Sequence, residues 1–257
     1  MDKMLLYKTA MLAGEIMAQS GAETFRVEDT MIRILRTSHF QTIEVHATTT
    51  GIMATLADPT IEPITGVKRI SNRSNNLSRI NEVNQISRNI CENSIDLNTA
   101  YDKLSAVRNV TTYSGLTVDL ATIISTIGFV GLFGGNIIDC MIAALNGLFI
   151  VIISRLLAKR LGSAFMVDAA KSLVIAIITM LSVSYFSQAH SEIIIIGSIM
   201  PLVPGIPITN AIRDTLQGDY TSGMARATEA FVVSLGIAVG VGFGMGLYNF
   251  IERMVNV

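Results

Sequence analysis

The stretch that decides the fold is PLVPGIPITNAIRD, residues 201–214. The apolar run IIIIGSIM, residues 193–200, stands directly before it, and together they reach the length of a membrane-spanning helix. Three prolines and Gly205 lie in its middle, within residues 201–207. Each proline removes a backbone donor and clashes with the preceding turn, so a continuous helix is disfavoured. We therefore expect two half-helices separated by unwound residues 204–207.

A broken span of this kind has a functional meaning. Inside a membrane, freed backbone groups are tolerated only where protein buries them or a watery cavity meets them. Several transporter folds build their binding sites from such broken helices. A helix N-terminus at Gly205 and the guanidinium of Arg213 would both attract a carboxylate. An ordinary proline kink is the alternative. The expected substrate-binding residues are Pro204, Gly205, Pro207, Thr209, Asn210, Arg213 and Asp214.

Composition places this segment in a membrane protein. The chain has 257 residues, 50% of them hydrophobic and 15% charged, with a mean hydropathy of +0.51. Soluble domains carry more charge, about a quarter of their residues. The charges gather in residues 1–112, and long apolar runs fill residues 113–257. The expected fold is mainly α, with a small α+β cytoplasmic domain (1–112) followed by a helical transmembrane domain (113–257).

Periodicity gives the elements of the first domain. Ser20 followed by Glu23 fits a capping box before an apolar periodic run, which predicts that the second helix starts there. β-branched residues and a turn at Asp58-Pro59 predict three strands. The expected helices cover 3–18, 22–37, 76–92 and 96–109, and the strands cover 42–50, 51–57 and 61–70.

Five apolar segments of about twenty residues follow, each long enough to span a bilayer. The loops after the second and fourth segments carry arginine or lysine, whereas residues 134–136 and 188–192 carry neither. Because basic loops stay inside, we expect a multi-pass protein of the cytoplasmic membrane with an inner N-terminal domain and an extracytoplasmic C-terminus. The expected spans are 115–134, 137–154, 167–187, 191–212, which is broken, and 228–251.

Polar groups within apolar segments are candidates for function because charge there is costly. Asp119 is the expected proton-coupling residue, with solvation at the membrane surface as the alternative. Asp139 fits the interfacial interpretation better, and Arg213 with Asp214 could form a structural ion pair. In the fifth segment, glycines four residues apart between Gly236 and Gly246 predict close helix packing.

Other classes of function find little support. We identify no nucleophile elbow, phosphate loop, metal-ligand spacing or cofactor motif, so no enzyme is expected. A membrane-anchored hydrolase would have to gather Glu23, Arg26, Glu44 and His46 in one pocket. Basic residues show no interleaved aromatics, which argues against nucleic acid as a partner. The two cysteines fall in different parts of the chain, so no disulfide is expected.

These residues resemble a known family. PGIPITNAIRD at 204–214, with Gly218-Asp219 and Arg226 beyond it, is similar to the signature of the threonine/serine exporter family. GAETFRVE at 21–28 fits the same family, as does Phe133-Gly134-Gly135 between the first two expected spans. The resemblance covers nearly the whole chain.

The resemblance implies an exporter in the cytoplasmic membrane. Full-length members of the family fuse two membrane halves, and this chain resembles only the first, larger half. In split members a separate small membrane subunit supplies the second half, and some split members are associated with succinate. We therefore expect a proton-driven secondary exporter subunit for threonine, serine or C4-dicarboxylates, working in an oligomer within the lipid bilayer. The alternatives are the hydrolase above and a regulatory or assembly subunit whose soluble domain gates a partner.

Overall fold

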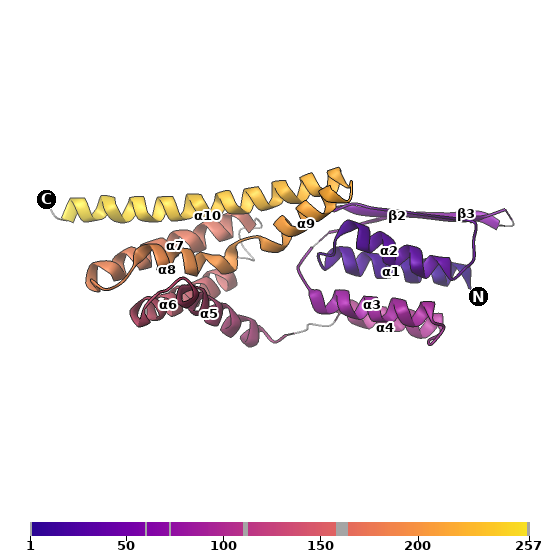
Figure 1. Cartoon of the computed structure of the whole chain (residues 1–257), viewed down its shortest axis with the longest axis horizontal. Helices are drawn as coiled ribbons and strands as arrows, with labels where there is room; N and C mark the ends of the chain where they lie inside the picture. Colours follow the sequence, from indigo (N-terminus) through magenta and orange to yellow (C-terminus); the bar gives the residue numbers. More distant parts are fainter. Residues whose placement is uncertain (1, 60, 72, 110–112, 158–163, 256–257) are drawn as a thin grey trace. The chain divides into compact units, whose positions relative to one another are not determined.

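The computed structural model describes residues 2–59, 61–71, 73–109, 113–157 and 164–255 (Figure 1). It is mainly helical with one small sheet, which confirms the expected class. Backbone contacts divide the chain into two compact units. Unit 1 holds Met1–Thr112 and Gly205–Thr228, and unit 2 holds Tyr113–Pro204 and Glu229–Val257. Residues 205–228, which were expected to belong to the transmembrane domain, therefore group with the N-terminal residues.

Unit 1 contains three layers, which Figure 1 shows at its labelled elements. Helices α1 (Lys3–Gln19) and α2 (Thr24–Arg36) form the middle layer. The sheet covers one side of this pair, and helices α3 (Leu77–Cys91) and α4 (Leu97–Asn109) cover the other. Burial of one apolar face per helix explains the arrangement, and Leu6, Ile16, Met31, Leu35 and Leu104 are fully enclosed in the core.

The sheet is a three-stranded antiparallel meander. Strands β1 (Thr42–Ala47), β2 (Gly51–Asp58) and β3 (Ile61–Arg69) pair in chain order. Alternate residues of β2, namely Ile52, Ala54 and Leu56, are buried, as the two-residue period of a strand requires. The three expected strands and the four expected helices of this region are therefore present, with ends within a few residues of the predicted ones.

One local prediction was wrong. Ser20 ends helix α1 instead of starting α2, and its buried hydroxyl has no hydrogen-bond partner among the described residues. The residue before the first turn of α2 is Glu23, and its side chain makes no capping bond. The capping box therefore does not form, and the first amides of α2 find their partner elsewhere in unit 1.

Unit 2 contains helices α5 (Gly115–Leu132), α6 (Ile137–Leu157), α7 (Ala164–Tyr185) and α8 (Ser191–Ile199). These helices pack on one another, with α6 contacting α5, α7 and α8. Helix α10 (Tyr220–Val255) starts in unit 1 and continues through unit 2. In the described part of the chain, four helices are long and apolar enough to cross a membrane, or five if the pair α8 and α9 counts as one broken span.

The broken segment has its break earlier than expected. Helix α8 is followed by a 3₁₀ turn at Met200–Leu202, and helix α9 (Gly205–Leu216) begins after two intervening residues. Val203 is extended and separates the two helical pieces. Gly205, Ile206 and Pro207 were expected to be unwound, but they form the first turn of α9. A proline fits there because the first amides of a helix have no intrahelical acceptor.

The glycines of α10 lie on two faces. A Cβ added at Gly240 would lie 2.3 Å from the Ala169 carbonyl oxygen of α7, and one added at Gly244 would lie 2.6 Å from the Leu173 carbonyl oxygen. The expected close packing is therefore confirmed within the subunit. Close packing was also expected at Gly242 and Gly246, but added Cβ atoms there meet nothing within 4 Å.

Candidate functional site

The candidate site lies within unit 1, where the loop between α1 and α2 meets α9 and the start of α10. Gly21 in this loop has a φ of +82°, a conformation that favours glycine. A Cβ there would also lie 2.6 Å from the Asn75 Oδ1 atom. The Asn210 side-chain amide donates to the Gly21 carbonyl oxygen at 2.9 Å. The loop is therefore held in one shape by its glycine and by α9.

Asp214 of α9 is the buried centre of this site. Its Oδ1 atom accepts a 3.0 Å hydrogen bond from the Thr24 backbone amide, and its Oδ2 atom accepts a 3.1 Å bond from the Thr24 hydroxyl. Thr24 is the first residue of α2, whose first amides lack intrahelical acceptors. A carboxylate at a helix N-terminus also interacts favourably with the helix dipole. Asp214 therefore supplies the cap that the local sequence does not.

Arg226 of α10 neutralises this buried carboxylate. Its Nε atom lies 2.8 Å from the Asp214 Oδ2 atom, an ionic contact without the angle of a hydrogen bond. Its Nη2 atom donates to the Ala22 carbonyl oxygen at 2.7 Å. Both side chains are nearly inaccessible to solvent. A buried charge pair is tolerated when additional hydrogen bonds satisfy it, and this pair has three.

Glu23 forms the second ionic group of the site. Its Oε1 atom accepts a hydrogen bond from the Arg213 Nη1 atom, and its Oε2 atom lies 3.4 Å from the Arg26 Nη1 atom. The carboxylate is buried, whereas both arginine side chains are partly exposed. The suggested pairing of Arg213 with Asp214 is wrong, because the two neighbours bond to different partners, Glu23 and Arg226 respectively.

A pocket of about 250 Å³ opens beside this group, entirely within unit 1. Glu23, Arg26, Asn210 and Arg213 supply its polar side chains near the ion pairs. Leu77 and Ile80 of α3 supply an apolar wall. A pocket with two guanidinium groups, one carboxylate and one amide can hold a small ligand that carries both a carboxylate and an amine.

The structure brings together most of the residues expected from the broken span. Gly205, Thr209, Asn210 and Arg213 line the pocket, and the Thr209 hydroxyl donates to the Gly205 carbonyl oxygen at 2.9 Å. Asp214 takes part in the capping network described above. Pro207 lies in the first turn of α9 but does not line the pocket, and Pro204 belongs to unit 2.

Residues from the N-terminal loop complete the site and were missed as pocket residues. Glu23 and Arg26 were not expected at a substrate pocket, and Thr24 and Arg226 were not assigned a role at the site. The signature at residues 21–28 was the available signal, since it stood beside that of residues 204–214 in the family resemblance. Nothing in the spacing alone indicated that two segments so far apart in sequence would meet.

The four residues of the hydrolase alternative do not gather in one pocket, because Glu23 and Arg26 pair with each other whereas Glu44 and His46 lie on strand β1. Glu23 is engaged by two arginines, and the His46 Nδ1 atom lies 3.5 Å from the Glu28 Oε1 atom. Glu44 is exposed on strand β1. Within the described ranges, no group of three or more His, Cys, Asp or Glu side chains could hold a metal ion. Both cysteines, Cys91 and Cys140, are free thiols.

Unit 2 contains polar contacts of its own. The Asn146 side-chain amide in α6 donates to the hydroxyls of Thr179 at 3.1 Å and Ser198 at 3.0 Å, and all three side chains are buried. Such bonds join helices in an apolar environment. Asp119, the expected proton-coupling residue, forms an ion pair with Arg155. Its role in coupling stays a prediction.

Asp139 differs from its expected interfacial, solvated state. It is fully buried in the first turn of α6. Its carboxylate accepts hydrogen bonds from the Asn136 amide at 2.9 Å and the His190 amide at 2.8 Å, and its Oδ2 atom lies 2.9 Å from the His190 Nδ1 atom. Asp139 therefore links the start of α6 to the residue before α8 and serves the packing of unit 2.

Comparison with known proteins identifies the family of the chain. The family model described as "Putative threonine/serine exporter" matches residues 8–248, which include both segments that form the site. The chain belongs to this family. Together with its apolar helices, membership identifies a multi-pass membrane protein of an exporter family.

Two curated relatives show how the family varies in length. A "Probable threonine/serine exporter" of Mycobacterium tuberculosis is 22% identical over 88% of this chain, which spans only 43% of that relative. A "Probable succinate transporter subunit YjjP" of Klebsiella aerogenes is 24% identical over 90% of this chain and 89% of its own length. The exporter-family chain thus spans less than half of the first relative and most of the second. No solved structure matches it.

Proposed function

We propose that this chain is the large subunit of a proton-coupled secondary exporter in the cytoplasmic membrane, acting with a second, small membrane subunit. The proposal rests on one observation above others: Glu23, Arg26, Asn210 and Arg213 converge on one small pocket. Membership of the exporter family and the subunit named among its relatives support it. In this proposal the pocket receives the substrate from the cytoplasm.

The charges of the pocket favour a zwitterionic amino acid. Arg213 and Arg26 would bind the substrate carboxylate, and Glu23 would accept hydrogen bonds from its ammonium group. Such a ligand replaces the present ion pairs of Glu23 by contacts of its own with both arginines and with Glu23, and leaves no buried charge without a partner. Threonine and serine fit this description, and their hydroxyl group could bond to Asn210.

A C4-dicarboxylate is the second candidate, because one relative is named a succinate transporter subunit. Its two carboxylates would face both the arginines and the buried Glu23 carboxylate. A substrate carboxylate and the Glu23 carboxylate would repel each other within one small pocket, so Glu23 would have to be protonated or turn away. The pocket therefore favours the zwitterion, and Glu23 is the residue that distinguishes the two substrates.

The test is export from proteoliposomes that hold the chain with a small membrane subunit of the same family. We expect flux of labelled threonine or serine that depends on an imposed pH gradient. Arg213→Gln should reduce this flux about tenfold or more, since one charge-assisted bond contributes more than about 1.4 kcal/mol. Arg69→Gln, on the exposed end of β3, is the matched control.

Glu23→Gln separates the substrates in the same assay. We expect it to reduce amino acid flux and to leave succinate flux, where there is any, unchanged or higher. The opposite pattern would assign the dicarboxylate. Absence of flux for every small carboxylate tested, with both subunits correctly inserted, would end the proposal.

A further inference from the structure

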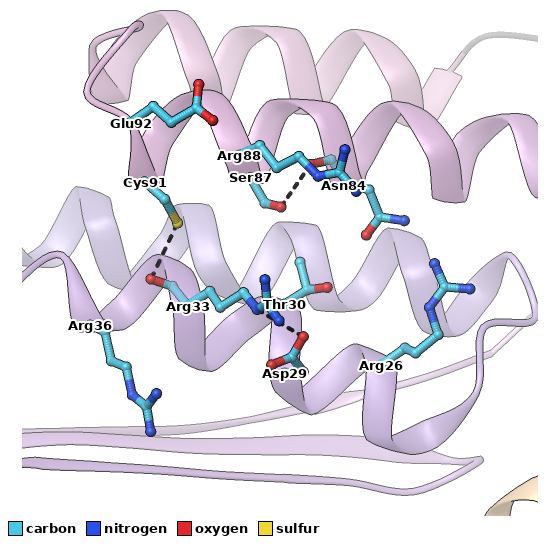
Figure 2. A pocket seen from close by; sticks show the side chains of 10 residues that line it. All are labelled: Arg26, Asp29, Thr30, Arg33, Arg36, Asn84, Ser87, Arg88, Cys91 and Glu92. Carbon is cyan, nitrogen blue, oxygen red and sulfur yellow. Dashed lines mark hydrogen bonds and ion pairs between the residues drawn. The ribbon is translucent and has the colours of Figure 1, made fainter.

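A second pocket, larger than the first, lies between helices α2 and α3 of unit 1. It has a volume of about 640 Å³. Figure 2 shows Arg26, Arg33 and Arg36 coming from α2, and Arg88 reaching from α3 on the other side. We call this pocket the arginine groove. Nothing in the exporter cycle proposed above uses it.

The arginine groove carries an excess of positive charge. Four arginines line it, against two carboxylates, those of Asp29 and Glu92. The Arg33 Nε atom lies 2.9 Å from the Asp29 Oδ2 atom, and Arg26 bonds to Glu23. Within the described part of the chain, Arg36 and Arg88 have no ion-pair partner. The lining arginines outnumber the lining carboxylates by two, so an excess of positive charge is available to attract a ligand.

The other lining residues are also suited to a polar, charged ligand. Thr30 and Ser87 are buried and bring hydroxyl groups to the lining, and the Ser87 hydroxyl donates to the Asn84 carbonyl oxygen at 2.9 Å. Burial raises the pKa of the Cys91 thiol, whose Sγ atom lies 3.6 Å from the Arg33 carbonyl oxygen. The thiol therefore stays neutral at physiological pH and adds no negative charge.

We propose that the arginine groove binds a small dianion through Arg88 and the arginines of α2. Guanidinium groups match carboxylate and phosphate oxygens in pairs, and the lining has two more arginines than carboxylates. An apolar ligand is excluded because no lining residue carries a large apolar side chain. A phosphate and a dicarboxylate share the required chemistry, so the test compares both.

Arg26 connects the arginine groove with the substrate pocket, because it lines both. In the substrate pocket it contacts Glu23. A dianion that attracts Arg26 into the groove weakens that contact and changes the charge of the substrate pocket. This regulatory step rests on the proposed export function, whereas binding to the groove does not.

The binding test uses the purified full-length chain in a non-ionic detergent. Titration calorimetry with inorganic phosphate, and separately with succinate, is compared with sodium chloride at equal ionic strength. We expect saturable binding of at least one dianion. Arg88→Gln and Arg36→Gln should each weaken it roughly tenfold, which corresponds to about 1.4 kcal/mol. The matched control Arg69→Gln, outside the groove, should bind as the unmodified chain does.

A second measurement locates the ligand. In a Cys140→Ser background, the bound dianion should slow alkylation of Cys91, which lines the groove. Binding of phosphate alone, succinate alone or both identifies the ligand class and supports the site. No saturable binding beyond the chloride control, equal weakening by Arg69→Gln, or no protection of Cys91 would overturn it. Failure of export with intact binding would count against the proposed function only.

Discussion

The Oδ1 atom of Asp214 accepts a hydrogen bond from the backbone amide of Thr24, 190 positions earlier in the chain. Helix α2 is thus capped by a residue of α9 and not by its own neighbours. The cap carries a charge, and Arg226 balances that charge from a third helix. The N-terminal loop, α9 and the start of α10 therefore depend on one another for their stability.

Replacement of Asp214 by asparagine tests this dependence. Asp214→Asn keeps the shape and one acceptor but leaves the buried Arg226 without its counter-charge. Loss of one partner of a buried pair costs about 3 kcal/mol, so we expect a clear drop in melting temperature in detergent. The double variant Asp214→Asn with Arg226→Gln should recover part of the loss, because it removes the unpaired charge.

The matched control is Asp29→Asn, which breaks the exposed pair with Arg33 on the same unit. Exposed pairs contribute little to stability, so its melting temperature should hardly change. Equal effects of Asp29→Asn and Asp214→Asn would show that the Asp214 network does not stabilise unit 1.

The two glycine faces of α10 predict opposite outcomes for the same substitution. Gly240→Ala would place a methyl group 2.3 Å from the Ala169 carbonyl oxygen, and the helices would have to separate. We expect a cost of about 1–3 kcal/mol from this overpacking. Gly242→Ala points into open space and should stay within about 0.5 kcal/mol of the original. Thermal unfolding in detergent compares the two variants directly, and equal destabilisation would contradict the packing of α10 on α7.

The carboxyl group of Glu28 should make the free energy of unfolding depend on pH. Burial raises the pKa of this carboxyl above its ordinary value of 4.5, although a hydrogen bond from the Ala47 amide opposes the shift. Between 4.5 and the raised pKa, the folded protein binds more protons than the unfolded chain. The contribution of Glu28 to stability is therefore fully present below 4.5 and is lost as the pH rises through the raised pKa.

The Glu28→Gln variant should remove this dependence. Its side-chain oxygen can still accept from the Ala47 amide, but it carries no charge at any pH. Unfolding measured between about pH 4 and 7, which covers the ordinary pKa and the range above it, should give a flatter profile for Glu28→Gln than for Glu82→Gln, whose side chain is exposed on α3. Parallel profiles for the two variants would rule out a contribution from Glu28.

The predicted role of Asp119 in proton coupling can be tested separately from its ion pair with Arg155. Asp119→Asn cannot carry a proton, so we expect export that no longer responds to the pH gradient. The charge exchange Asp119→Arg with Arg155→Asp keeps an ion pair between α5 and α6. This double variant should keep the fold, but its export should still not respond to the pH gradient. Unchanged gradient dependence in Asp119→Asn would show that another group carries the proton.

Much of the architecture could be predicted from local patterns. The helices and strands of residues 3–109 follow from apolar periodicity and β-branched runs, and the proline cluster located a real break in the fourth apolar segment. The exact break differed because Gly205 and Pro207 tolerate a first helical turn as well as they disfavour a helix interior.

The candidate site could be predicted only in part. Asn210 and Arg213 were identified because they follow the broken segment, and both line the pocket. Their partners Gly21 and Glu23 lie in a loop that local rules assigned to a capping box. Periodicity and capping rules describe near neighbours, so a cap donated from a distant helix leaves no local signal. The arginine groove was equally hidden, because Arg88 stands far from the arginines of α2 in the sequence.

The division of unit 1 between two distant segments has a consequence for synthesis of the protein. Residues 205–228 leave the ribosome after α5, α6, α7 and α8 have been made. Until then Thr24 has no cap from Asp214, and Glu23 has no Arg213. The N-terminal residues can collapse early. Their hydrogen bonds to Arg213 and Asp214 form only after the intervening apolar helices have been synthesised. Unit 1 can therefore reach its final structure only after the apolar helices between its two segments have been synthesised.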